Sequence, residues 1–116
     1  MNLTKEMTPS FEKVTSITDS TVFVQRFCVK ALELLEEFKV KYSEAIIARQ
    51  IKDLGSITHK ISSTMKWLDL EDFMSLTESY KDLAVQDKKS MEKLLGEVIH
   101  YTDKLEDAIR AKLSEL

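Results

Sequence analysis

The sequence predicts an all-α protein, an antiparallel four-helix bundle that follows a short N-terminal lead-in. Its 116 residues include only two glycines and one proline, which leaves little material for the many turns of a β-rich fold. Apolar residues recur in alternating steps of three and four along most of the chain, as on the buried face of a helix. Short connections between these stretches favour antiparallel neighbours. We therefore expect a lead-in over residues 1–18 and one helical domain over residues 19–116.

The first long helical stretch comes after this polar lead-in. Residues 1–18 hold the only proline and show no sustained period, so we expect a loose segment with a short helical turn near Phe11–Val14. Asp19 or Ser20 is a suitable N-cap for the long helix. Without internal proline or glycine the pattern fits one long helix or two, and we expect a bend near Leu35–Glu37. The apolar positions of the stretch are Val24, Phe27, Cys28, Ala31, Leu35, Phe38, Tyr42, Ala45 and Ile46.

The second helical stretch begins after Arg49 and Gln50 and places a histidine on its solvent side. Its buried stripe consists of Ile51, Leu54, Thr58, Ile61, Met65 and Leu68. At about 100° per residue, His59 points roughly 130° away from the centre of that stripe. By the same arithmetic, its neighbours on the outward face are Lys52, Gly55, Ser56, Ser63 and Lys66. Trp67 also projects away from the stripe, so we expect it either to anchor a partner or to be covered by the N-terminal segment.

Two further helices complete the bundle. Asp69 is the expected N-cap of the first of them, with Asp72 three residues later as in a capping box. That helix should bury Leu70, Phe73, Leu76, Tyr80 and Leu83. Asp87 is the expected N-cap of the last helix. The apolar stripe of the last helix is Met91, Leu95, Val98, Thr102, Leu105 and Ile109.

Composition excludes several functional classes. A net charge of −3, with 32% charged residues, is not that of a polybasic nucleic-acid binder. The N-terminal residues lack the apolar run of a signal peptide, and no stretch has the roughly 18 apolar residues of a membrane helix. A single cysteine, Cys28, cannot form an intramolecular disulfide, and its place on the apolar stripe predicts a core residue. We expect a cytoplasmic monomer that binds neither nucleic acid nor membrane.

Metal and nucleotide chemistry find no support in the sequence either. The chain has two histidines and one cysteine, and they are not at the spacing of metal ligands. It also lacks the glycine-rich loops that cradle phosphate groups. We therefore expect no metal and no cofactor in this chain.

His59 remains the candidate nucleophile. The small residues beside it would let a partner surface approach the imidazole, and Lys52 and Lys66 would offset the charge of a phosphoryl group. An imidazole with an ordinary pKa near ~6.5 is largely neutral in the cytoplasm and is nucleophilic without an activating base. A lone outward histidine is also an ordinary surface residue, and the sequence leaves that alternative open. His100 lies on a face with Asp103, Asp107, Lys93, Lys104 and Gly96, which is typical of a solvated surface.

The stretch around His59 resembles the histidine phosphotransfer (HPt) domains of two-component phosphorelays. The resemblance covers roughly residues 17–113, and its specific part is Leu54, Thr58-His59-Lys60-Ile61, Leu68-Asp69-Leu70 and Phe73 through Tyr80. The chain diverges after the histidine. Ser62 and Ser63 stand where the family usually has lysine and glycine, and Asp69 stands at the position of a later glycine.

This resemblance implies a phosphoryl carrier rather than an enzyme. His59 would accept a phosphoryl group from the aspartate of a receiver domain and pass it to a second receiver, with the Mg²⁺ held by the receiver and not by this chain. The expected docking residues are Lys52, Gly55, Ser56, Lys60, Ser62, Ser63 and Lys66. The alternative is a phosphorylation-independent helical interaction module that has kept the bundle, and the serines at positions 62 and 63 favour that alternative. A weaker, third alternative is a structural bundle or oligomerisation domain, which would need a larger exposed apolar face than the helices show in the sequence.

Overall fold

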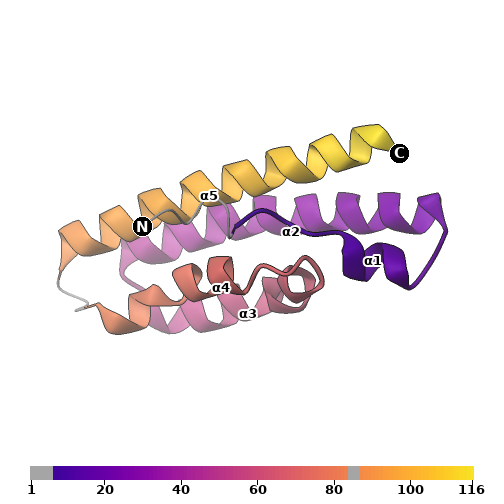
Figure 1. Ribbon diagram of the computed structural model, residues 1–116. Helices are drawn as coiled ribbons and strands as arrows, with labels where there is room; N and C mark the ends of the chain where they lie inside the picture. Colours follow the sequence, from indigo (N-terminus) through magenta and orange to yellow (C-terminus); the bar gives the residue numbers. More distant parts are fainter. Residues whose placement is uncertain (1–6, 84–86) are drawn as a thin grey trace.

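The computed structural model describes residues 7–83 and 87–116, and the regular elements in them are all helices, without a β-strand (Figure 1). The elements are α1 (Glu12–Ser16), α2 (Thr21–Ala48), α3 (Ile51–Trp67), α4 (Glu71–Thr77), a short 3-10 helix η1 (Ser79–Asp82) and α5 (Lys88–Glu115). The all-α prediction is therefore confirmed. The expected helical turn near Phe11–Val14 is present as α1.

The long helices α2 and α5 form the spine of the molecule. In Figure 1, α2 lies between α5 and α3 and runs in the opposite direction to both. Helix α4 packs against α3 and α5, on the other side of the core from α2. Side chains of α2 reach α4 across that core: the rings of Phe38 and Phe73 meet edge to face at 6.2 Å. The Tyr42 hydroxyl donates to the Thr77 carbonyl at 2.8 Å.

Helix α2 is one uninterrupted helix of 28 residues, so the predicted bend near Leu35–Glu37 is wrong. Sharp bends need a proline, a glycine or a group inserted into the hydrogen-bond ladder, and no proline or glycine lies in this helix. Leu35 and Phe38 are buried in the same core, and α5 is equally long and packs along α2. Ser20 is the N-cap, because its hydroxyl accepts a hydrogen bond from the Phe23 N–H at 3.2 Å.

Helix α3 ends in a left-handed turn that corrects the role predicted for Asp69. The N-cap of α4 is Leu70, without a side-chain cap, whereas Asp69 has a φ of 56° and closes α3. The Leu70 N–H donates to the Met65 carbonyl at 3.0 Å and the Asp69 N–H to the Lys66 carbonyl at 3.1 Å, a Schellman motif. The Asp69 carboxylate contacts the Lys13 ammonium at 2.6 Å instead of capping α4.

The left-handed conformation of Asp69 leads to a prediction for the stability of the protein. We expect Asp69→Gly to raise the free energy of unfolding by about 0.5–1 kcal/mol, because glycine adopts positive φ without steric cost. Asp69→Ala should lower it by about 1 kcal/mol, since alanine has neither that freedom nor a short polar side chain. The exposed pair with Lys13 adds little in either case. Urea denaturation of both variants checks the opposite signs, and a loss of stability in the glycine variant would contradict the prediction.

The core contains most of the apolar positions predicted from the sequence. In α3 the stripe residues after Ile51 are buried through Leu68, which is the C-cap. Cys28 is fully buried, as expected, and burial raises the pKa of its thiol. In α5 the buried residue is Leu94, whereas Leu95 is only partly buried. The Asp87 cap is confirmed by a hydrogen bond from the Ser90 N–H at 3.1 Å.

Two expectations about the edges of this core are wrong. The fourth helix is shorter than its stripe suggested: α4 ends at Thr77, η1 carries the buried Tyr80, and Leu83 is only partly buried. The described part of the lead-in is not loose, since Met7 and Val14 are buried in the core. The Ser10 N–H also donates to the Leu68 carbonyl at 2.9 Å. These tertiary contacts hold the N-terminal segment against the core, although its sequence has no sustained helical period.

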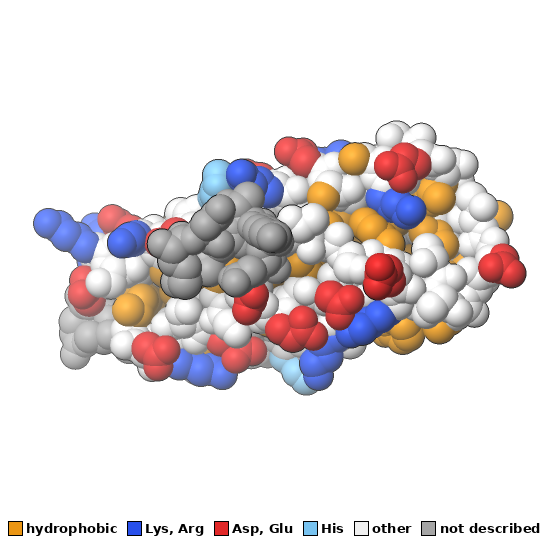
Figure 2. Space-filling view, viewed as in Figure 1, with side chains coloured by type: hydrophobic (Ala, Val, Ile, Leu, Met, Phe, Trp, Pro, Cys, Tyr) orange, Lys and Arg blue, Asp and Glu red, His pale blue; other side chains and the backbone are white. Residues whose placement is uncertain are grey.

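The surface carries both signs of charge. Figure 2 shows acidic and basic side chains interspersed along the molecule and hydrophobic side chains gathered at the end that holds α1. Among the described residues, no helix has the length and apolar character needed to cross a membrane.

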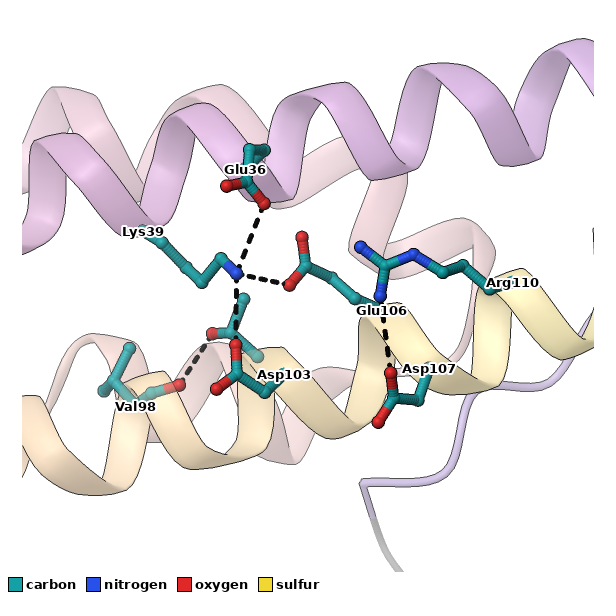
Figure 3. Close-up of polar contacts among 8 residues, drawn as sticks. Glu36, Lys39, Val98, Asp103, Glu106, Asp107 and Arg110 are labelled. Carbon is teal, nitrogen blue, oxygen red and sulfur yellow. Dashed lines mark hydrogen bonds and ion pairs between the residues drawn. The ribbon is translucent and has the colours of Figure 1, made fainter.

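One carboxylate is buried between α2 and α5, as Figure 3 shows. The side chain of Glu106 is 2% exposed, and its Oε1 contacts the Lys39 ammonium at 2.6 Å. Within residues 7–83 and 87–116, its Oε2 has no hydrogen-bond partner. Lys39 also contacts Glu36 at 3.2 Å and Asp103 at 3.1 Å. Burial raises the pKa of Glu106, whereas hydrogen bonds from the lysine to these carboxylates, Glu106 first, raise the pKa of Lys39 above its usual range. The sequence did not predict this cluster.

Candidate functional site

His59 is exposed on α3 and lines an open hollow between α3 and the α4–η1 segment. Its neighbours Thr58 and Ile61 are buried and fix the orientation of the helix. The hollow has a volume of about 470 Å³. From α3 it is lined by Gly55, Thr58, His59, Ser62 and Lys66, and from the facing segment by Glu71, Met74, Ser75, Glu78 and Lys81. We call this space the His59 hollow.

Gly55 opens the approach to the imidazole. Helical side chains lean toward the N-terminus of their helix, so the His59 side chain lies over the turn that contains Gly55. A β-carbon at position 55 would lie 3.8 Å from the Tyr80 hydroxyl, an ordinary van der Waals distance. Packing within the chain therefore does not require glycine at this position. Its absent side chain instead leaves space beside the histidine.

The charges around the His59 hollow are balanced rather than strongly basic. Lys66 and Lys81 line it together with Glu71 and Glu78. The ammonium of Lys81 contacts the Glu78 carboxylate at 3.5 Å, so part of its charge is offset within the chain. An incoming phosphoryl group would meet two cations there, and an acidic partner surface would also meet two carboxylates.

The structure brings together four of the eight residues predicted for the site. Gly55, Ser62 and Lys66 share the hollow with His59, and the Ser62 hydroxyl donates to the His59 carbonyl at 2.8 Å. The hydroxyl therefore supports the backbone of the helix rather than the imidazole. The predicted residues outside the hollow's lining are Lys52, Ser56, Lys60 and Ser63.

These four residues lie elsewhere on α3. Lys52 and Ser63 are exposed to solvent, and Ser56 lines a separate groove between α2 and α3. The Lys60 ammonium contacts the Glu37 carboxylate of α2 at 2.5 Å. This hydrogen bond holds the pKa of Glu37 below its usual range. Lys60 thus ties α3 to α2, and its charge faces away from the α4 side of α3.

Sequence reasoning missed the wall contributed by α4 and η1. Glu71, Ser75, Glu78 and Lys81 recur at steps of three and four, opposite the apolar stripe of that segment. This spacing is that of a polar helix face, but it does not show which helix the face would meet. The polar residues of the α4–η1 segment could be seen in the sequence, but only the packing of α4 on α3 shows that they border the His59 hollow.

The other candidates lie away from the His59 hollow. His100 is exposed on α5, where its ring meets that of Tyr101 edge on at 5.1 Å. Trp67 is 40% exposed and lines an apolar hollow of about 160 Å³ with Val14, Ile17, Phe23 and Phe27. The N-terminal segment therefore borders Trp67 but leaves part of the ring open to solvent. A role for this ring in anchoring a partner stays a prediction.

Within the described residues, no group of three or more histidine, cysteine, aspartate or glutamate side chains is arranged to hold a metal ion. Comparisons with protein-family models, with curated proteins and with solved structures find no match for this chain. A functional assignment therefore depends on the geometry around His59 and on the sequence pattern that surrounds it.

Proposed function

We propose that this chain is a histidine phosphotransfer protein that relays a phosphoryl group between receiver-domain aspartates through His59. The proposed architecture is an antiparallel four-helix bundle of α2, α3, α4 with η1, and α5. The observation that carries the proposal is the exposed imidazole of His59 on a core helix, beside an open hollow, with glycine one turn away. A carrier needs little more than this, because the receiver supplies the metal and the acidic pocket.

In the proposed reaction, a phosphorylated receiver docks over the His59 hollow. A ring nitrogen of His59 attacks the phosphorus atom in line, a new N–P bond forms, and the bond to the receiver's aspartate oxygen breaks. The aspartate leaves as a carboxylate, and Mg²⁺ and lysine in the receiver stabilise the transferring group. The reverse geometry passes the phosphoryl group from His59 to a second receiver. The chain needs no cofactor of its own for either step.

The divergent positions are compatible with this proposal. Ser62 and Ser63 are small, so they preserve access to the imidazole. Lys66 and Lys81 border the hollow and provide positive charge where the family's usual lysine is absent. Asp69, at the position of the family's later glycine, has the positive φ that glycine favours.

Phosphotransfer from a receiver tests the proposal. Incubation with a phosphorylated receiver should give an acid-labile label on the wild-type chain and none on His59→Gln, which removes the nucleophilic nitrogen. His100→Gln is the matched control, because it removes the other exposed histidine and should be labelled normally. A label of equal size on His59→Gln would overturn the proposal.

The second candidate is a helical interaction module that binds its partner without phosphorylation. The charges favour it, because Glu71 and Glu78 face an incoming acidic receiver and the Lys60 ammonium is paired with Glu37. This candidate predicts receiver binding that survives His59→Gln and does not depend on phosphorylation of the receiver. Isothermal titration with phosphorylated and unphosphorylated receiver separates the two functions.

A further inference from the structure

The solvent face of α2 carries a line of apolar side chains. Figure 1 shows α2 between α5 and α3, and α4 lies across the core, so the opposite side of α2 faces outward. On that side Val22 is 53% exposed, Val29 45%, Val40 54% and Ile47 75%. At about 100° per residue these four positions lie within roughly 20° of one direction. They make up half of the exposed large hydrophobic side chains within residues 7–83 and 87–116.

The line is symmetric about its own midpoint. Val22 and Ile47 are equally far from the point between residues 34 and 35, and so are Val29 and Val40. When the positions between them on the same outward face are included, the line advances in alternating steps of four and three, like the a and d positions of a coiled coil. Each symmetric pair then joins an a position to a d position. That is the pairing that an antiparallel arrangement of two copies requires. The intervening positions of the same stripe pair in the same way: Arg26 with Ser43, and Glu33 with Glu36.

We propose that a second copy of this chain packs on the outward face of α2, antiparallel and related by a two-fold axis near residues 34 and 35. Val22 of one copy then packs on Ile47 of the other, and Val29 on Val40, each contact occurring twice as in an isologous dimer. A monomer is the expectation from the sequence, and sedimentation of the full chain separates it from this dimer. The interface lies on α2, whereas the His59 hollow lies between α3 and α4, so the histidine stays accessible in the dimer.

The charges beside the stripe agree with a second copy as occupant. In the antiparallel register Lys30 faces Glu37 of the second copy, which is an opposite-charge pair that also occurs twice. The Glu37 carboxylate also pairs with Lys60 of its own chain, so this contact between copies adds only a small stabilisation. The central pair, Glu33 with Glu36, is unfavourable: it also occurs twice, so four carboxylates gather at the two-fold axis. Within each chain, however, Lys30 contacts Glu33 at 3.9 Å and Lys39 contacts Glu36 at 3.2 Å, which offsets part of this repulsion.

The remaining polar pair of the stripe joins Arg26 and Ser43. The serine is small, so it leaves room for the long arginine side chain of the second copy. Its hydroxyl oxygen can accept a hydrogen bond from the guanidinium, which carries donors only. This pair therefore fits the antiparallel register without adding a further like-charge contact to the interface.

The expected dimer is weak. Two α2 helices, each about 42 Å long, would bury a total area on the order of 1,200 Å², which is at the low end for stable complexes. The acidic centre of the interface weakens the dimer further. We expect a dissociation constant of about 10–100 µM. Sedimentation velocity of the full chain from 5 µM to 1 mM should show the shift from monomer to dimer. A single monomeric species at 1 mM would overturn the proposal.

Substitutions locate the interface. Val40→Arg should raise the dissociation constant at least tenfold, since it places a charge opposite Val29 in two symmetric contacts. Ile17→Arg is the matched control, because Ile17 is exposed to a similar degree, 56%, but lies outside α2. It should associate like the wild type. Equal effects of the two substitutions would place the contact elsewhere and overturn the proposal.

Cysteine cross-linking tests the direction of packing. Two copies of Val29 lie about 16 Å apart along the antiparallel pair, beyond the ~7 Å that a disulfide spans between Cα atoms, whereas Val29 lies opposite Val40. Under a mild oxidant, Val29→Cys mixed with Val40→Cys should cross-link, and either variant alone should not. The native Cys28 can remain, because its thiol is buried. A cross-link of Val29→Cys with itself would indicate parallel packing and overturn the proposal. Phosphotransfer to His59 can be measured separately in Val40→Arg, so a failure of the dimer proposal and a failure of the proposed function are distinguishable.

Discussion

Lys39→Met is expected to lower the free energy of unfolding by about 3–5 kcal/mol near neutral pH, the cost of leaving a buried carboxylate without its counter-ion. The Glu106 side chain is 2% exposed, and the Lys39 ammonium is the one group that contacts it as an ion pair among the described residues. Among the described residues its second oxygen has no hydrogen-bond partner, and the nearby Glu36 carboxylate, which itself raises the pKa of Glu106, cannot replace the charge of the lysine. Methionine preserves most of the packing of the lysine stem, which leaves the charge as the main change.

The loss of unfolding free energy in Lys39→Met should increase as the pH rises. Burial raises the pKa of Glu106 above the ordinary value of about 4.3, and Lys39 opposes that shift. Without the lysine the pKa rises further. Between the ordinary and the raised pKa, folded Glu106 keeps a proton that the unfolded chain has lost, so stability falls as the pH rises through this window. The destabilisation of Lys39→Met should therefore be small near pH 4.5 and largest near pH 7.5.

Urea denaturation at both pH values measures this difference. Lys39→Met combined with Glu106→Gln should recover much of the stability, because the neutral amide removes the unpaired charge. Lys30→Met is the matched control: its pair with Glu33 is exposed and should contribute less than about 1 kcal/mol. A loss in Lys39→Met that is equal at both pH values would mean that packing of the stem, and not the charge, stabilises the seam between α2 and α5.

The sequence predicted the helices better than it predicted their neighbours. The stripe from Leu54 to Leu68 and the Asp87 cap depend on local periodicity and local hydrogen bonds, and both agree with the structure. The bend predicted in α2 was wrong, and the sequence already argued against it, since α2 contains no proline or glycine. What the pattern of α2 could not show is that an equally long helix, α5, packs along it. Asp69 was misassigned because an aspartate suits both an N-cap and a left-handed turn, and hydrogen bonds from residues on either side decide between them.

The candidate site divides in the same way. Periodicity correctly placed His59 on the outward side of α3, with Gly55 beside it. It could not show that Lys60 would pair with Glu37 of α2, nor that the α4–η1 segment would border the hollow. Glu106 was missed for a related reason. It lies at the edge of the α5 stripe, and only the presence of Lys39 on the facing helix makes its burial possible.

Gly55→Leu is expected to slow phosphotransfer through His59 about 100-fold or more without lowering stability. A leucine one turn before the histidine would extend into the His59 hollow beside the imidazole, and small displacements from the in-line geometry reduce transfer strongly. Glycine in an exposed helix interior is less favourable than leucine by up to about 1 kcal/mol. The first atom of the new side chain fits, since a β-carbon at this position lies 3.8 Å from the Tyr80 hydroxyl. Because of the gain in helix propensity, the variant should unfold at an equal or higher urea concentration.

Gly96→Leu is the matched control for this prediction. Gly96 lies in the interior of α5, and a β-carbon there would meet nothing within 4 Å. Both substitutions should therefore stabilise the chain to a similar degree, and only the one at position 55 should slow labelling by a phosphorylated receiver. Normal labelling of Gly55→Leu, in a chain whose His59→Gln variant is unlabelled, would mean that the receiver reaches the imidazole from the Ser63 side of α3. Slow labelling confined to Gly55→Leu would instead show that a receiver reaches the imidazole through the space that Gly55 leaves open.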